Sequence, residues 1–188
     1  MAKVGNIEVE VQIIEKTKEM ILERGFKGWN MDDLAFESGV AKRTLYKIIG
    51  KKEELIARIY LDNTRRTISN VKELLNSNKE YKEMLYEFSE EFPRYISAFA
   101  LKTMVQLRRE FPQIGSSIDE LIGYQVETFK KLYQRGIDQG IFRSELNGAL
   151  IVETINSLIR HFIQSGRSEA EFEKDLTLVL HSAFKGFM

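Results

Sequence analysis

Apolar residues recur every three or four positions along most of this chain, which is the spacing of one face of an α-helix. Between residues 11 and 24 they include Ile13, Met20 and Ile21, with Glu and Lys between them, and Gly25 follows. A glycine directly after an apolar stripe is a typical helix end. The pattern therefore predicts a first helix over residues 11–24.

Two short helical segments follow, and Gly39 separates them. Asn30 precedes the segment MDDLAFES, and an Asn side chain in that place accepts hydrogen bonds from the first-turn N–H groups. The segment VAKRTLYKII is long enough for about two turns and ends at Gly50. The first 50 residues are therefore predicted to form three compact helices. The side chains expected to pack inward between the last two are Leu34, Val40 and Leu45.

The rest of the chain continues as longer helices. A long helix is expected over residues 51–75, and two more over residues 81–111, where Pro93 and Pro112 are taken as interruptions. Residues 118–137 carry a clean apolar stripe that Gly136 and Gly140 are expected to end. The last two helices are expected over residues 146–163 and 172–187. The prediction is an all-α protein of about nine helices, in which the long helix joins a three-helix N-terminal domain to a C-terminal bundle.

Composition narrows the class of protein. The 188 residues include no cysteine, which excludes disulfides, thiolate catalysis and cysteine-based zinc sites. No apolar run approaches the ~18 residues of a membrane span, and the N-terminus lacks the apolar core of a secretory signal. We therefore expect a cytoplasmic protein without a membrane partner. The 28 basic and 28 acidic residues balance, so any nucleic-acid binding must be local.

A local concentration of positive charge does exist. Lys42, Arg43, Lys47, Lys51 and Lys52 fall within eleven residues, with no acid among them. Such a run is more often a solvated face than a binding site. Here it coincides with two short helices joined by a glycine-containing turn, the helix-turn-helix arrangement that places its second helix in the major groove of DNA. DNA contact is therefore the favoured interpretation.

The two lysines at the start of the long helix add to this interpretation. A cation at a helix N-terminus opposes the helix dipole by roughly 0.3–1 kcal/mol unless an anion lies nearby. A DNA phosphate would supply that anion at Lys51 and Lys52.

The stretch ERGFKGWNMDDLAFESGVAKRTLYKIIGKKEEL resembles the signature of the TetR family of bacterial transcriptional regulators. The matching features are Gly25-Phe26, Leu34-Ala35, Gly39-Val40, Leu45-Tyr46 and Lys52-Glu53, and RGIDQGIFR matches the family more weakly. Ala41 departs from the Ser or Thr that commonly caps the recognition helix.

The resemblance implies contacts for particular residues. The tyrosine matching Tyr46 and the lysine matching Lys52 contact phosphates, and the side chains matching Lys42 to Thr44 and Lys47 approach bases or backbone. Among these, Arg43 or Lys47 is expected to read guanine, since Lys and Arg make the commonest guanine contacts. The full set expected at DNA is Asn30, Lys42, Arg43, Thr44, Tyr46, Lys47, Lys51 and Lys52.

The resemblance also implies a small effector between the helices that follow the DNA-binding domain. Met and aromatic residues line adaptable apolar pockets well, which suggests a largely apolar effector. The candidate lining residues, most of which must also serve the core, are Phe88, Phe92, Tyr95, Phe99, Met104, Phe129 and Tyr133.

The last two helices are expected to build a homodimer, since the family uses the corresponding helices of two subunits for a four-helix interface. A two-fold dimer sets its recognition helices about one turn of B-DNA apart, or a multiple of it, and so fits a palindromic operator. The candidate interface residues are Leu150, Leu158, Phe162, Leu176, Val179 and Ala183.

The sequence analysis assigns residues 1–50 to DNA binding and residues 51–188 to effector binding and dimerisation. The favoured function is a repressor that a small molecule releases from its operator. The alternative is a DNA-binding protein of the same fold with no effector pocket, acting constitutively or through a protein partner; a pocket of ~300 Å³ or more would favour the switch. No catalytic motif, cofactor site or metal site is recognisable, so an enzyme is not expected. His161 and His181 have no carboxylate or cysteine at metal-ligand spacing, and His161 is expected to pack in the core or an interface.

Overall fold

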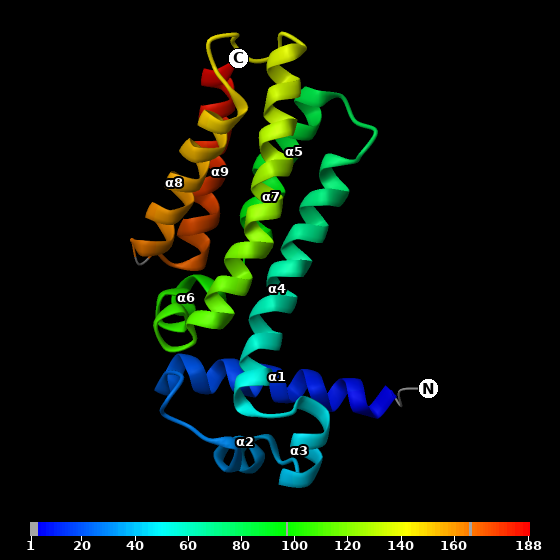
Figure 1. The fold of residues 1–188 in the computed structure, drawn as a ribbon, viewed down its shortest axis with the longest axis vertical. Helices are drawn as coiled ribbons and strands as arrows, with labels where there is room; N and C mark the ends of the chain where they lie inside the picture. The colour runs from blue at the N-terminus through cyan, green and yellow to red at the C-terminus, as the bar shows by residue number, and fades with distance from the viewer. Residues whose placement is uncertain (1–3, 97, 166) are drawn as a thin grey trace. The chain divides into compact units, whose positions relative to one another are not determined.

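The computed structural model describes residues 4–96, 98–165 and 167–188, which form nine α-helices and no strand (Figure 1). The all-α prediction is confirmed. The helices are α1 (Val4–Arg24), α2 (Met31–Ser38), α3 (Lys42–Ile49), α4 (Lys52–Leu75), α5 (Tyr81–Tyr95), α6 (Ala98–Glu110), α7 (Pro112–Asp138), α8 (Gly148–Gln164) and α9 (Glu169–Phe187). Within the described residues, no helix is both long enough and apolar enough to span a membrane.

The helices form two compact units. Residues 1–63 and 103–118 make the first unit, and residues 64–102 and 119–188 make the second. In the first unit α1, α2 and α3 pack on one another, as Figure 1 shows. The second part of α6 and the start of α7 belong to this unit as well: Phe111 lies edge-on to Phe26 at 5.6 Å, and the Tyr60 and Thr103 hydroxyls share a hydrogen bond.

Local sequence signals fix α2 as predicted. Asn30 accepts hydrogen bonds from the backbone N–H groups of Asp32 and Asp33, while the Asp33 carboxylate accepts one from the Asn30 N–H at 2.8 Å. This reciprocal pair is a capping box. At the other end Gly39 has φ 66° and ψ 19°, the left-handed conformation that glycine adopts without steric cost.

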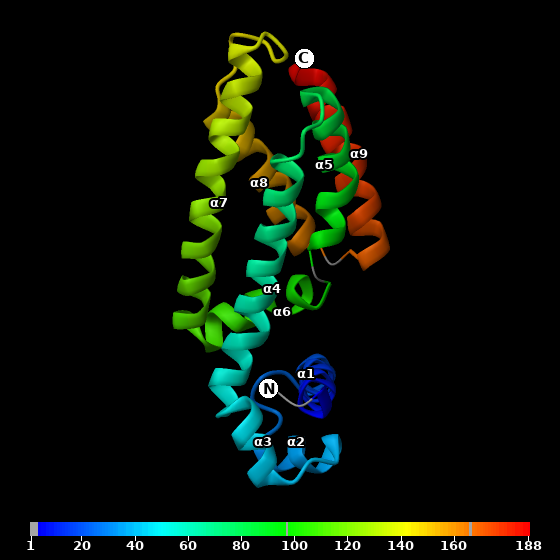
Figure 2. The same ribbon diagram turned by 90° about the vertical axis from the view of Figure 1, so that its right-hand side faces the viewer.

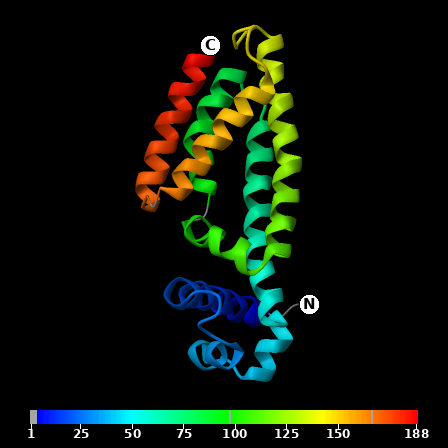
Figure 3. The same ribbon diagram turned by 60° about the vertical axis from the view of Figure 1, so that its left-hand side comes forward.

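In the second unit α5 lies antiparallel to α9, and α8 lies beside α9 (Figures 2 and 3). Aromatic rings fill much of the space between them. Phe184 of α9, for example, has its ring centroid 5.9 Å from that of Tyr133 and 6.3 Å from that of Phe88. Burial raises the pKa of the Tyr133 hydroxyl far above its ordinary value, because the phenolate would lose its hydration.

Two helix boundaries differ from the prediction at the prolines. Pro93 lies inside α5 rather than between two helices, and the chain leaves the helix at Ile96, which has φ −86° and ψ 115°. Proline removes one backbone N–H but does not end the helix at its own position. Pro112 is the first residue of α7, where no intrahelical partner is needed for the missing N–H, so α7 begins six residues before the predicted Ile118.

Gly136 also differs from its predicted role as a helix end. It is buried inside α7, which continues to Asp138. A Cβ atom at this position would lie 2.6 Å from the Tyr81 hydroxyl oxygen and 2.8 Å from the Phe142 ring. The glycine therefore permits close packing against these rings, and Gly140, with φ 69°, follows the end of the helix.

Candidate nucleic-acid interface

The two faces of α3 differ sharply. Leu45 and Ile49, four residues apart, are 0% and 5% exposed and hold the helix on the rest of the first unit. The side chains on the opposite face, all exposed, are Lys42, Arg43, Thr44, Tyr46 and Lys47. Burial of the first pair thus turns the predicted DNA-binding residues of α3 to solvent.

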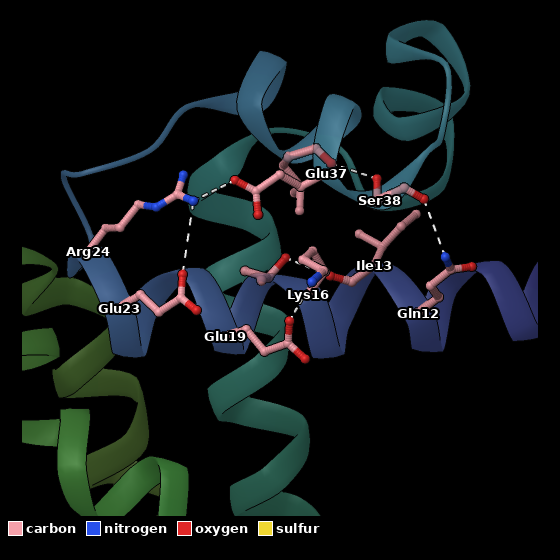
Figure 4. A network of polar contacts seen from close by, with 10 residues as sticks. Gln12, Ile13, Lys16, Glu19, Glu23, Arg24, Glu37 and Ser38 are labelled. Atoms are coloured by element: carbon pink, nitrogen blue, oxygen red, sulfur yellow. Dashed lines mark hydrogen bonds and ion pairs between the residues drawn. The ribbon is translucent and has the colours of Figure 1, made fainter.

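Hydrogen bonds and ion pairs join α2 to α1 and so fix the helix against which α3 packs (Figure 4). The Arg24 guanidinium lies 2.7 Å from the Glu37 carboxylate, and the Gln12 amide donates a hydrogen bond to the Ser38 carbonyl at 3.3 Å. Ser38 is buried and its hydroxyl donates to the Leu34 carbonyl at 2.6 Å. These contacts join the middle and the C-terminal end of α1 to the last turn of α2.

The start of α3 has no side-chain cap, as Ala41 predicts. Instead, the Lys42 ammonium lies 2.5 Å from the Asp32 carboxylate, which raises the pKa of Lys42 through the hydrogen bond and the charge of Asp32. Both side chains are exposed, so the pair contributes little to stability. Among the described residues, no carboxylate pairs with Arg43, Lys47 or Lys51. These three cations are available to an external anion.

The start of α4 carries its own acids. The Glu54 carboxylate accepts a hydrogen bond from the Lys51 backbone N–H at 2.8 Å, and Glu53 also lies in the first turn. Carboxylates at this end of a helix interact favourably with the positive end of the helix dipole. They offset the lysines at the start of α4, so the exposed cations, rather than the helix dipole, are the main attraction for a phosphate.

Lys52 has an environment that the sequence did not reveal. It is half-buried, its ammonium lies 3.9 Å from the centroid of the Trp29 ring, and it donates a hydrogen bond to the Trp29 carbonyl. Asn30, the first residue of the predicted DNA-binding set, is exposed and follows Trp29 at the start of α2.

The second unit contains a small pocket between α5, α7 and α8, with about 240 Å³ of empty space that includes some open to solvent. Four residues of the expected effector set line it: Phe88, Phe92, Phe129 and Tyr133. The remaining lining comes from α8, namely Val152, Ile155, Asn156 and Ile159.

The other three residues of the expected effector set lie elsewhere. Tyr95 is half-buried against the core of the second unit, Phe99 is half-buried in α6, and Met104 belongs to the first unit. One buried amide stands out near the pocket. Gln125 lies one turn before Phe129 on α7, and neither atom of its amide has a hydrogen-bond partner among the described residues.

Comparison with known proteins decides the family. Residues 13–59, which span most of α1, all of α2 and α3 and the start of α4, match the sequence model of the bacterial regulatory proteins of the tetR family. A solved TetR-family transcriptional regulator, PfmR from Thermus thermophilus, is 25% identical and superimposes with a TM-score of 0.77 over 94% of this chain and 98% of its own. Residues 13–59 therefore carry the DNA-binding region of the TetR family. The chain is accordingly a DNA-binding transcriptional regulator and not an enzyme.

Two further similar proteins are a fatty acid metabolism regulator and the transcriptional regulator FadR. The fatty acid metabolism regulator protein of Bacillus subtilis (strain 168) is 23% identical over 148 residues, which cover 77% of this chain and 76% of the relative. The solved structure of FadR from Bacillus subtilis in complex with stearoyl-CoA is 18% identical, with a TM-score of 0.70 over 90% of this chain and 96% of the other. At 18% identity, the likeness to FadR shows a shared fold alone.

The residues expected at a TetR-type dimer interface differ in how deeply they are buried within the single chain. Leu176 is 0% exposed and Phe162 is 7% exposed, because both belong to the core of the second unit. Leu150 is 47% exposed, and Leu158, Val179 and Ala183 are half-buried. Leu178, outside the expected set, is 62% exposed. The accessible apolar surface on α8 and α9 therefore lies beside several of the expected residues rather than on all of them.

The two histidines occupy different environments. His161 is exposed, so it does not pack in the core of this chain, and its alternative expected place at an interface stays a prediction. His181 is half-buried, stacks on Tyr86 with ring centroids 4.8 Å apart, and has its Nε2 3.3 Å from the Glu90 carboxylate.

Proposed function

We propose that this chain is a homodimeric repressor that binds a palindromic operator and leaves it when a small, largely apolar effector binds. The observation that carries the DNA-binding part is the division of α3, with Leu45 and Ile49 buried and a row of exposed cations on the opposite face. A rigidly seated helix with an exposed basic face suits the major groove. The place of action is then the cytoplasm, where the DNA lies.

The residues divide between two kinds of contact. Arg43 and Lys47 lie on the outer face of α3 and are proposed to reach base edges, where guanine O6 and N7 are the preferred acceptors. Sugars and phosphates are proposed to be contacted by Asn30, Lys42, Thr44 and, at the start of α4, Lys51 and Lys52. Such contacts position the protein on the duplex without reading its sequence. Tyr46, 42% exposed, can donate its hydroxyl to a phosphate oxygen. Residues 1–50 thus serve DNA binding, and residues 51–188 serve effector binding and dimerisation.

A fatty acyl effector is supported by the pocket and by the relatives. Rings of α5 and α7 and aliphatic side chains of α8 line the pocket, which suits an acyl chain. The Asn156 amide within the lining, and the unpartnered Gln125 amide one turn from Phe129, suit a carbonyl or carboxyl group on the same molecule. The fatty acid regulator of Bacillus subtilis and the FadR complex with stearoyl-CoA point to the same chemistry.

The effector would act through its unequal affinity for two arrangements of the helices. In this structure the cavity itself measures about 20 Å³, far below the ~300 Å³ of a typical ligand site, so an acyl chain must separate the rings of α5 and α7 from α8. We propose that this separation moves α4, which contributes residues to both compact units, and so changes the spacing of the two reading heads.

The dimer is proposed to form through α8 and α9, with the exposed Leu150 and Leu178 and the half-buried Leu158, Val179 and Ala183 in the contact. A two-fold interface repeats every contact in both subunits and sets two recognition helices on one face of the duplex. Leu176 and Phe162 would support this surface from within their own chain.

The small pocket also favours a second candidate function. A DNA-binding protein of the same fold that acts constitutively, or under the control of a protein partner, needs no ligand cavity. The cavity of about 20 Å³ between α5, α7 and α8 fits that alternative. The two functions differ in whether any acyl compound changes the affinity for DNA.

Selection from a pool of random duplexes tests the DNA-binding proposal. We expect an enriched inverted repeat whose half-sites lie about 10 base pairs apart, or a multiple of that, because each subunit presents one α3. Sequencing after several rounds reads the result, and the Arg43→Ala protein serves as the control that should enrich a weaker or altered motif. Recovery of random sequence by the unchanged protein would refute sequence-specific binding.

A further inference from the structure

Lys52, one of the residues proposed to contact DNA, packs against Trp29, which is not in that set. Trp29 is 3% exposed and lies in the segment between α1 and α2, while Lys52 is the first residue of α4. The Lys52 ammonium lies over the face of the Trp29 ring, 3.9 Å from its centroid, and donates a hydrogen bond to the Trp29 carbonyl. One residue therefore contacts the ammonium twice, through its ring and through its backbone.

This arrangement holds the ammonium without neutralising it. No carboxylate forms an ion pair with Lys52 among the described residues. Burial lowers the pKa of Lys52, and the more distant Asp33 and Glu110 only partly offset that effect. A desolvated ammonium without a counter-ion binds an external anion more strongly than a fully hydrated one, because part of its hydration has already been lost.

We propose that Trp29 is a positioning residue that fixes the Lys52 ammonium for contact with a DNA phosphate. An ammonium has three N–H donors, and the Trp29 carbonyl uses one, which leaves donors for a phosphate oxygen. A lysine side chain is otherwise flexible, so a ring and a carbonyl that hold it in one place reduce the entropy lost when it meets the phosphate. The inference rests on the proposed binding of DNA.

The chain offers matched variants at this contact. Trp29→Leu removes the aromatic face, whereas Trp29→Phe keeps a face and removes the indole N–H, which is buried without a partner among the described residues. Lys52→Met removes the charge and keeps most of the length of the side chain. These variants separate the positioning of the charge from the packing of the ring.

The measurement is the slope of log affinity against log salt concentration, on the duplex selected by the unchanged protein. Each lost phosphate contact reduces the slope by about 0.9, so a dimer should lose about 1.8 in both Trp29→Leu and Lys52→Met. Trp29→Phe should keep nearly the unchanged slope. The Trp29→Leu/Lys52→Met double variant should lose no more than either single variant, because both remove the same contact.

Fluorescence provides a second readout that does not depend on any Trp29 substitution. Trp29 is the only tryptophan in the chain, so its emission reports on the ammonium above the ring. We expect operator DNA to change this emission in the unchanged protein and to change it far less in Lys52→Met. A purely structural Trp29 would instead lower the melting temperature of Trp29→Leu, leave the salt slope intact and give Lys52→Met the same emission change as the unchanged protein.

The outcomes separate this inference from the proposed function. If the unchanged protein shows salt-dependent operator binding and the Trp29→Leu slope equals it, the positioning role is refuted while the function stands. If the unchanged protein binds no duplex, both fall together. Equal loss of slope in Trp29→Leu and Lys52→Met, with Trp29→Phe unaffected, establishes the role.

Discussion

Replacing Arg43 and Lys47 together with alanine is expected to weaken binding to the selected operator by roughly 30-fold or more. Both side chains are exposed on the outer face of α3, and no carboxylate pairs with them in the described part of the chain. A bidentate contact with a base is worth about 1–3 kcal/mol, and a dimer makes each contact twice, so a single base-reading side chain already accounts for this loss. Fluorescence anisotropy with labelled operator measures the change.

A control for charge removes two lysines elsewhere. Lys82 of α5 and Lys131 of α7 are exposed, so the Lys82→Ala/Lys131→Ala protein has the same net charge as the test variant. We expect it to bind the operator like the unchanged protein. The test variant should also lose discrimination between the operator and a scrambled duplex. Unchanged affinity and unchanged discrimination would remove α3 from base recognition.

Replacing Asn156 with tryptophan is expected to raise the acyl-CoA concentration needed to release the operator by roughly 100-fold. Asn156 lines the pocket and is half-buried, so an indole at this position can occupy the space between Phe92, Phe129 and Ile159. Overfilling such a site costs a ligand about 1–3 kcal/mol. Titration of the protein–operator complex with acyl-CoA thioesters of graded chain length measures the effect.

The control places the same indole outside the pocket. Lys131 is exposed on α7, and Lys131→Trp should respond to the acyl-CoA series like the unchanged protein. Without effector, Lys131→Trp should also bind the operator like the unchanged protein, because Lys131 lies outside the pocket lining. If the unchanged protein fails to respond to any acyl compound, the constitutive or partner-controlled alternative replaces the switch.

Signals that act within a few residues of the chain predicted structure well. The ends of α2 follow from Asn30, Asp33 and Gly39, whose side chain or backbone conformation acts directly on the adjacent turn. The same signals place Leu45 inward and the cations of α3 outward. The predicted helix-turn-helix is therefore largely a local property of the sequence.

Tertiary contacts decided the features that the sequence did not predict. Gly136 resembles a helix end, yet the ring of Tyr81, distant in sequence, and that of Phe142, just past the helix, leave room only for a glycine inside α7. Pro93 and Pro112 show a related limit, since proline is compatible with the last turns of α5 and the first position of α7.

The apolar residues of α8 show that a sequence pattern does not identify the helix that packs against them. Val152, Ile155 and Ile159 follow helical spacing and line the pocket, whereas the sequence assigned this helix to a dimer interface. Periodicity identifies an apolar face but does not say which helix covers it. The contact of Lys52 with Trp29 was hidden for the same reason, because 23 residues separate its two members.

Salt titration of operator binding tests the central claim most directly. The claim is that the exposed Lys42, Arg43, Lys47 and Lys51, with the half-buried Lys52, form a basic surface that binds the phosphates of duplex DNA and presents α3 to its bases. If a dimer makes six to ten phosphate contacts, affinity should fall by roughly 1,000-fold or more between 50 and 200 mM NaCl. Affinity for duplex DNA that stays constant over this range would contradict the account.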